Sequence, residues 1–190
     1  MKVKFNYWIF LIILFPACMF YSFKGSIPAH IHSIALSPVQ NESTEFSAAE
    51  ILNDELNILM RVENVLDIVV PDHADSQLEV VITSVTDIPF TVSLSDELGM
   101  EEVEEWRITI STKVTWYDIK RDEILLKKQM SSWGVYSPGV DISNDNLDND
   151  NDNLIDSEDS DEVGSPRESA MNISVRRLTE DIVNEITNTW

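Results

Sequence analysis

The segment WRITISTKVTW, residues 106–116, decides the fold. Its apolar residues occupy every second position, interrupted only by Thr112, and polar residues fill the positions between them. Because a β-strand points successive side chains to opposite faces, one face of this strand is apolar and the other is polar. β-branched residues and tryptophan also suit a pleated, half-buried surface. The segment therefore predicts the central strand of an antiparallel sheet, with one face covered and the other open.

Shorter apolar or alternating runs on both sides of this segment predict the strands that accompany it. They lie at residues 30–38, 65–70, 78–85 and 124–136, and the central strand itself extends over about residues 103–119. The third run either ends at Val85 or continues past Pro89 to Ser93 with a bend. In the second case Pro89 lies within the strand, and a proline inside a strand needs a bulge or an edge position. The last run alternates weakly and carries two adjacent lysines, as is typical of an edge strand.

Two segments have the apolar spacing of helices that lie on a sheet. The first extends from Ser47 to about Glu63, and Ser47 with Glu50 matches a capping box. The second begins at Ser165–Pro166 and continues toward the end of the chain. The apolar stripes are Ile51, Leu52, Leu56, Leu59, Met60 and Val62 in the first, and Met171, Val175, Leu178, Ile182 and Ile186 in the second. This order predicts an α+β two-layer sandwich, a mostly antiparallel sheet with both helices on one face.

The length and the net charge of the chain limit the number of domains and the kinds of ligand that we expect. The chain has 190 residues, which suggests a single domain, and a net charge of −21. Such acidity argues against a non-specific nucleic-acid binder, which needs lysine and arginine to neutralise phosphates. Ten of the acidic residues fall within residues 141–162, where no lysine or arginine occurs. We therefore interpret residues 30–190 as one domain with an acidic insertion at residues 139–164.

The N-terminus has the three parts of a secretory signal. Lys2 and Lys4 form a basic start, residues 7–15 are an apolar run, and Ala17 precedes Cys18, the only cysteine. A small residue directly before a cysteine is typical of a bacterial lipoprotein signal. We predict that residues 1–17 are removed, that Cys18 is lipidated, and that residues 18–29 form a tether. The alternative is an uncleaved anchor or an unmodified thiol.

Four further segments, taken together, resemble a known family: residues 21–28 after Cys18, residues 34–41, the segment LEVVITSV at 78–85 with Pro89 beyond it, and the closing helix Leu178–Trp190. In their order and spacing the chain resembles the lipopolysaccharide-assembly lipoprotein of the outer-membrane translocon. The resemblance implies a non-enzymatic subunit, anchored on the periplasmic side of the outer membrane. It also implies a position inside a large β-barrel partner, a role in lipopolysaccharide transport, and binding of lipopolysaccharide through basic residues.

The open face of the sheet offers candidates for that binding. Arg107 and Lys113 lie on the polar face of the central strand, and Lys128 or Lys127 on the neighbouring strand extends this pair. We hypothesise that Arg107, Lys113 and Lys128 contact lipid A phosphates or acidic residues of the barrel. The alternative is a solvated strand face without a ligand.

The acidic insertion contains a possible calcium loop. Its aspartates match loop positions 1, 3, 5, 9 and 12 of an EF-hand, with Asn153 in place of the glycine that the turn normally requires. The candidate ligands are Asp148, Asp150, Asp152, Asp156 and Asp159. The alternative is a disordered acidic spacer, which the same composition predicts.

No catalytic motif emerges, because the chain has no glycine-rich phosphate loop, no nucleophile elbow and no cysteine besides Cys18. His30 and His32 could share a strand face, but no further cysteine or third nearby histidine completes a zinc site. Two non-enzymatic functions remain: the translocon subunit, and a periplasm-facing lipoprotein adaptor or calcium-dependent interaction module.

Overall fold

Three long consecutive strands form one side of the sheet. The computed structural model describes residues 27–94, 101–138 and 165–188. In chain order the elements are β1 (Ser33–Leu36), β2 (Gln40–Asn41), α2 (Phe46–Glu63), β3 (Asp67–Ile68), the 3-10 helix η2 (Pro71–His73), β4 (Ser76–Leu94), β5 (Glu101–Asp118), β6 (Glu123–Tyr136) and α3 (Pro166–Asn188). The strand order in the sheet is β3-β1-β4-β5-β6, and β2 also pairs with β4.

The prediction of a central antiparallel strand at residues 103–119 is confirmed. β5 pairs antiparallel with β4 on one side and with β6 on the other. The even-numbered residues of β5 from Ile108 to Trp116 are buried. They include Thr112, whose hydroxyl donates a 3.3 Å hydrogen bond to the backbone carbonyl of Met130. Because this bond satisfies the buried hydroxyl, the residue that interrupts the apolar pattern does not interrupt the packing.

The short strands beside β4 are parallel to their neighbours. β1 pairs in parallel with both β3 and β4, and β2 pairs in parallel with β4. Parallel strands need a long crossover connection, and α2 provides it between β1 and β3. The sheet is therefore mixed at this side and antiparallel through its three long strands.

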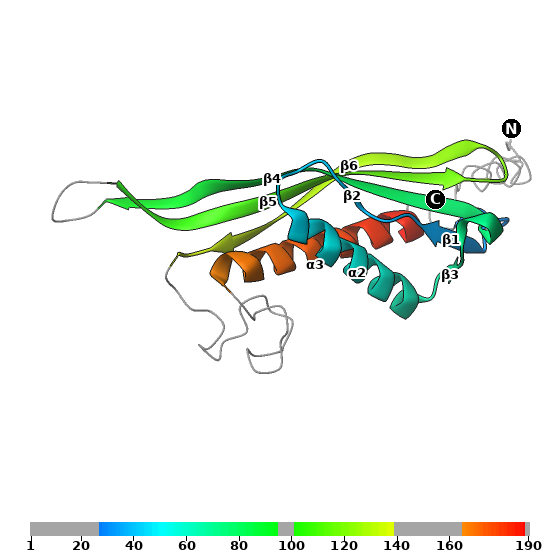
Figure 1. The fold of residues 1–190 in the computed structure, drawn as a ribbon, viewed down its shortest axis with the longest axis horizontal. Coiled ribbons are helices and arrows are strands. Elements are labelled where there is room, and N and C mark those ends of the chain that lie inside the picture. The colour runs from blue at the N-terminus through cyan, green and yellow to red at the C-terminus, as the bar shows by residue number, and fades with distance from the viewer. Residues whose placement is uncertain (1–26, 95–100, 139–164, 189–190) are drawn as a thin grey trace, which may run out of the picture.

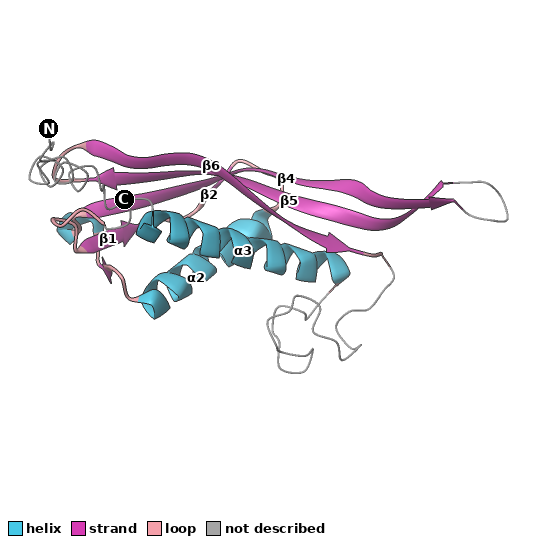
Figure 2. Cartoon of the chain, turned by 180° about the vertical axis from the view of Figure 1, so that it is seen from behind, coloured by secondary structure: helices cyan, strands magenta, loops and turns pink. Residues whose placement is uncertain are grey.

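Both helices lie on the same face of the sheet, as Figures 1 and 2 show from opposite sides. The predicted stripe of α3 is confirmed, because each of its members is buried: Met171, Val175, Leu178, Ile182 and Ile186. These side chains share one core cluster with the buried face of β5 and with Leu52 and Leu56 of α2. The predicted α+β two-layer sandwich is the observed architecture.

Two predictions about α2 are wrong. The helix begins at Phe46, and the side chain of its N-cap, Glu45, makes no capping hydrogen bond. Ser47 therefore lies within the first turn, where its hydroxyl donates a 2.8 Å hydrogen bond to the Glu45 carboxylate instead of forming a capping box. Val62 is 72% exposed. The buried residues of α2 follow one another at intervals of four, so the buried stripe does not include Val62. These residues are Ala48, Leu52, Leu56 and Met60.

The β4–β5 pair continues past the end of the helices as a two-stranded ribbon (Figure 1). The pairing of the two strands shifts between Pro89 and Thr91, which confirms that the proline needs an irregularity in the ladder. Neither described helix covers the strands here, and three apolar side chains of β4 are exposed: Ile88, Phe90 and Val92.

Candidate functional site on the open face of the sheet

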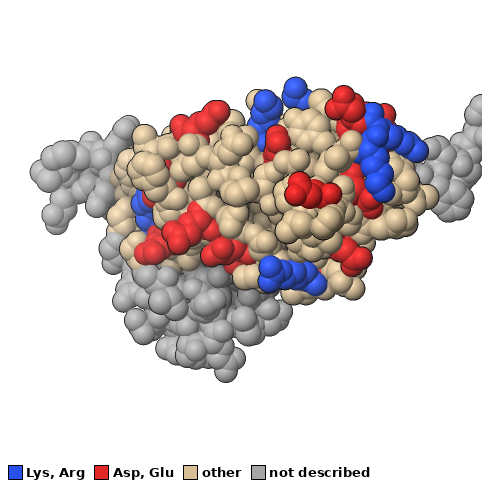
Figure 3. Space-filling model, turned by 45° about the vertical axis from the view of Figure 1, so that its right-hand side comes forward, with Lys and Arg blue, Asp and Glu red and all other residues tan. Residues whose placement is uncertain are grey.

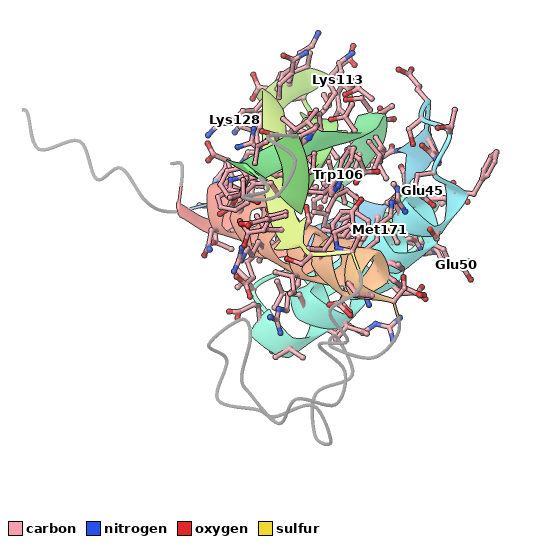
Figure 4. The ribbon with its side chains drawn as sticks, turned by 90° about the vertical axis from the view of Figure 1, so that its left-hand side faces the viewer. Glu45, Glu50, Trp106, Lys113, Lys128 and Met171 are labelled. Atoms are coloured by element: carbon pink, nitrogen blue, oxygen red, sulfur yellow. The ribbon has the colours of Figure 1, made fainter. Side chains whose placement is uncertain are left out.

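Arg107 and Lys113 lie on the face of β5 that points away from the helices. The buried even-numbered residues from Ile108 to Trp116 occupy the opposite face of the same strand. Figure 4 shows Lys113 above the sheet, on the side opposite to Met171 of α3. Because a strand rises about 3.4 Å per residue, roughly 20 Å of β5 separates the two cations. They are therefore two separate contact points on one face.

Arg107 lies beside two neighbouring aromatic rings. Its guanidinium carbon is 5.4 Å from the centre of the Phe90 ring and 5.9 Å from that of the Trp133 ring. The two ring centres are 6.3 Å apart. Phe90 belongs to β4 and Trp133 to β6, so each long strand contributes one side chain. We call these three residues the aromatic–arginine cluster. Cation–π attraction holds the guanidinium in place while leaving its positive charge available.

The aromatic–arginine cluster is accessible from outside. Phe90 is 48% exposed and Trp133 is 46% exposed, and Ile88, directly opposite Arg107 on β4, is 42% exposed. The Nε atom of Arg107 is buried and has no hydrogen-bond partner among the described residues. A positioned cation bordered by exposed apolar surface suits an amphiphile, which supplies an anionic group to the guanidinium and a hydrocarbon chain to the rings.

Sequence reasoning did not single out Phe90 or Trp133. Phe90 is two residues after Ile88, which pairs with Arg107, and its ring lies beside the Arg107 guanidinium. Trp133 lies opposite Thr109, which shares a strand face with Arg107. Both placements depend on the register between strands, which the alternation within one strand does not specify. The sequence feature that could have identified Phe90 and Trp133 is that both are large apolar residues on strand faces that are otherwise polar.

Lys128 lies on the other face of the sheet, so the structure does not bring it together with the open-face cations. The β5–β6 register places Lys128 opposite Val114, a buried residue of the helix-covered face. Its ammonium nitrogen is 2.7 Å from Oε2 of Glu185 in α3. Figure 4 shows Lys128 at the edge of the sheet. Lys127, opposite Thr115, is the β6 lysine that belongs to the open face.

A buried carboxylate joins the start of the described chain to the β5–β6 turn. Asp118, whose side chain is fully buried, lies 2.5 Å from His30 Nε2, which donates to its Oδ2. Its Oδ1 accepts hydrogen bonds from the backbone amides of Lys120 and Arg121 at 2.9 and 3.0 Å. Burial alone would raise the pKa of Asp118, but these hydrogen bonds, that of His30 foremost, hold the pKa below its ordinary value.

Asp75 makes a second connection at the same end of the sheet. Its Oδ1 is 2.5 Å from the Lys120 ammonium, and its Oδ2 accepts hydrogen bonds from the backbone amides of His32 and Ser33. The hydrogen bond from Lys120, followed by that from His32, sets the pKa of Asp75 far below its ordinary value. Among the described residues, no group of three or more His, Cys, Asp or Glu side chains is arranged to hold a metal ion.

Several predicted features lie outside the described residues. They are the signal peptide, Cys18 and the candidate calcium ligands Asp148, Asp150, Asp152, Asp156 and Asp159. Within the described part of the chain, no helix combines the length and the apolar character needed to cross a bilayer.

Residues 31–189 match the model of a protein family described as LptE, lipopolysaccharide-assembly. No curated protein matches the chain. Among solved structures, a hypothetical protein from Chlamydia trachomatis is similar with a TM-score of 0.53 and 14% identity, over 84% of this chain and 97% of that one. A putative neuraminyllactose-binding hemagglutinin homolog from Helicobacter pylori is similar with a TM-score of 0.50 and 16% identity, over 87% and 89% of the two chains. At these identities the structural likeness concerns the fold alone.

Proposed function

This chain belongs to the lipopolysaccharide-assembly family LptE, and we propose that it acts with an outer-membrane β-barrel in delivering lipopolysaccharide to the cell surface. The family match carries this proposal, because it extends from β1 through α3 and so includes every described helix and strand. The family's role is assembly, so we assign the chain no catalytic reaction.

The proposed anchor is an acylated Cys18. Several acyl chains hold a protein stably on a membrane, at about 0.8 kcal/mol for each buried methylene group. We place the domain on the periplasmic side of the outer membrane. This location is in keeping with its family and with the lipoprotein-type N-terminus.

The open face of the sheet is the surface that we assign to the translocon. The lumen of a large barrel is polar, and a domain within it needs a largely polar surface with a few specific contacts. The described open face offers such a surface, since Thr109, Ser111 and Lys113 follow Arg107 along β5. Within it, the aromatic–arginine cluster is the proposed point of contact with lipopolysaccharide. Its guanidinium would meet a phosphate, and its rings would meet an acyl chain.

Co-purification tests the partner. We expect the full-length chain, extracted from its own outer membrane, to bring down one large β-barrel protein in a stoichiometric amount. Recovery without any such barrel would contradict the proposed partner and would favour a periplasm-facing adaptor lipoprotein. An irrelevant lipoprotein of the same membrane, purified in parallel, controls for adventitious capture.

Charge reversal tests the aromatic–arginine cluster. We expect Arg107→Glu to weaken lipopolysaccharide binding about tenfold or more, because a charge-assisted hydrogen bond contributes about 1.5–3 kcal/mol. Lys113→Glu should have a smaller effect, since Lys113 is exposed and no aromatic ring among the described residues holds it in place. The dissociation constant, measured by titration with purified lipopolysaccharide, gives the readout.

Arg61→Glu is the matched control for this reversal. Arg61 is exposed in the last turn of α2, so the variant makes the same change in net charge on the helix layer. A loss of affinity as large in Arg61→Glu as in Arg107→Glu would show that net charge alone controls binding. The aromatic–arginine cluster would then have no role as a specific site.

A further inference from the structure

The β5–β6 turn carries exposed apolar and basic side chains at one end of the sheet. Ile119 is 43% exposed and Ile124 is 51% exposed. Tyr117 pairs with Ile124 across the hairpin. Lys120 and Arg121 lie between the two isoleucines, and their side chains are 63% and 59% exposed. We call these five residues the hairpin tip.

The hairpin tip lies where the described chain begins. Ile27 packs against the core, and three residues later His30 is bonded to Asp118, the last residue of β5. The backbone amide of Ile119 also donates a 2.9 Å hydrogen bond to the carbonyl of Asp75, just before β4. In Figure 1, β1 and the β5–β6 turn lie at the same end of the molecule.

The distance along the chain between the proposed anchor and the tip is short. Ile27 is nine positions after Cys18 in the chain, so their Cα atoms are at most about 30 Å apart. Because the tether is short, anchoring at Cys18 keeps the hairpin tip close to the membrane. The effective concentration of the tip at the membrane surface is then on the order of millimolar. A contact too weak to hold a free protein is therefore populated once the chain is anchored.

The composition of the hairpin tip suits the boundary between headgroups and acyl chains. Aliphatic side chains enter this region, tyrosine is enriched there, and lysine and arginine extend their charged ends toward water. The turn also contains Asp122 and Glu123, which balance its two cations. Figure 3 shows basic and acidic side chains next to one another toward the right-hand end of the molecule. Apolar insertion is therefore the expected mode of contact, rather than attraction to anionic lipid.

We propose that the hairpin tip is a second membrane contact, which inserts Ile119 and Ile124 into the surface of the bilayer that holds the acylated N-terminus. The inference rests on the proposed acylation of Cys18. The two contacts together fix the end of the sheet that carries the β5–β6 turn, and the β4–β5 ribbon extends from the opposite end (Figure 1). A single acylated cysteine would leave the domain free to rotate about its tether.

A depth-sensitive probe tests the contact. Because Cys18 is the only cysteine and acylation consumes its thiol, Ile119→Cys provides a single site for a bimane label. The labelled, acylated full-length chain is reconstituted in phosphatidylcholine vesicles that contain a lipid with a shallow nitroxide. Thr86→Cys is the matched control, since it is exposed and pairs with Thr109, ten residues before Ile119.

We expect the nitroxide to quench the label at residue 119 about threefold more than at residue 86, because interfacial elements insert their apolar side chains by about 5–10 Å. Ile124→Ser in the Ile119→Cys background should lower the quenching toward the control. Equal quenching at the two sites, with Cys18 shown by mass spectrometry to be acylated, would overturn this inference and leave the anchor intact. An unmodified Cys18 would overturn the anchor, and this inference with it.

Discussion

Gly134→Ala should lower the free energy of unfolding by about 3 kcal/mol, within the upper range for overpacked cores. A Cβ atom at residue 134 would lie 2.2 Å from the backbone oxygen of Ala170 in α3 and 2.9 Å from its carbonyl carbon. Because the added Cβ atom would clash with backbone atoms of Ala170, no side-chain rotation can relieve the clash. The helix α3 must therefore move away from β6. For a domain of this size the melting temperature should fall by about 6–12 °C. Thermal and urea unfolding followed by circular dichroism measure the change.

Two further variants test whether the close approach of α3 to β6 causes this loss of stability. Ser131→Ala on the same strand is exposed and should change stability by less than about 0.5 kcal/mol. Adding Ala170→Gly to Gly134→Ala should not restore stability, because the contact involves the carbonyl group and not the alanine methyl group. If Gly134→Ala proved as stable as the parent, the tight contact between α3 and β6 would be refuted.

The sequence predicted those helices and strands in which the apolar residues recur at the spacing of the buried face. The alternation from Trp106 to Trp116 located β5 and its two faces, and the apolar spacing from Met171 to Ile186 located α3 and its buried stripe. These patterns are informative because one side of each element is buried and the other is not. The periodicity of the apolar residues therefore predicted which face of β5 and which face of α3 pack in the core.

The features that sequence reasoning missed depend on contacts between elements. Ser47 has the residue types of a capping box around it, yet α2 begins one residue earlier, at Phe46. Propensity at a helix start is a weak preference that tertiary packing overrides. The parallel pairing of β1 with β3 and β4 likewise depends on the α2 crossover, whose path no local pattern encodes.

The candidate site was only partly predictable. The polar face of β5 identified Arg107 and Lys113, whereas the rings beside Arg107 come from strands on both sides of it. Composition alone groups Lys128 with these cations, but the observed register turns its side chain toward Glu185. Two adjacent lysines on one strand must face opposite ways, and only the register decides which of them shares a face with Lys113.

Asp118→Ala should destabilise the protein by about 2–4 kcal/mol, because removal of a buried charged acceptor leaves its hydrogen-bond donors without a partner. The donors are the His30 ring and the backbone amides of Lys120 and Arg121. Without the Asp118 carboxylate, the β5–β6 turn would no longer be bonded to the chain segment that precedes β1. Asp118→Asn, which keeps an oxygen acceptor for the two amides, should cost less. Urea unfolding at pH 7 measures both variants, and Asp54→Asn on the exposed side of α2 is the control.

The same carboxylate should make stability depend on pH in acid. The pKa values of Asp118 and Asp75 are lower in the folded protein than their ordinary value, so the unfolded chain binds more protons in the interval between. Their stabilisation is complete above the unfolded pKa, about 4, and is lost as the pH falls through the folded pKa values. The free energy of unfolding should therefore decrease below about pH 4 in the parent, and Asp75→Asn with Asp118→Asn should flatten this decrease. A double variant with the parent's full acid dependence would show that other carboxylates control it.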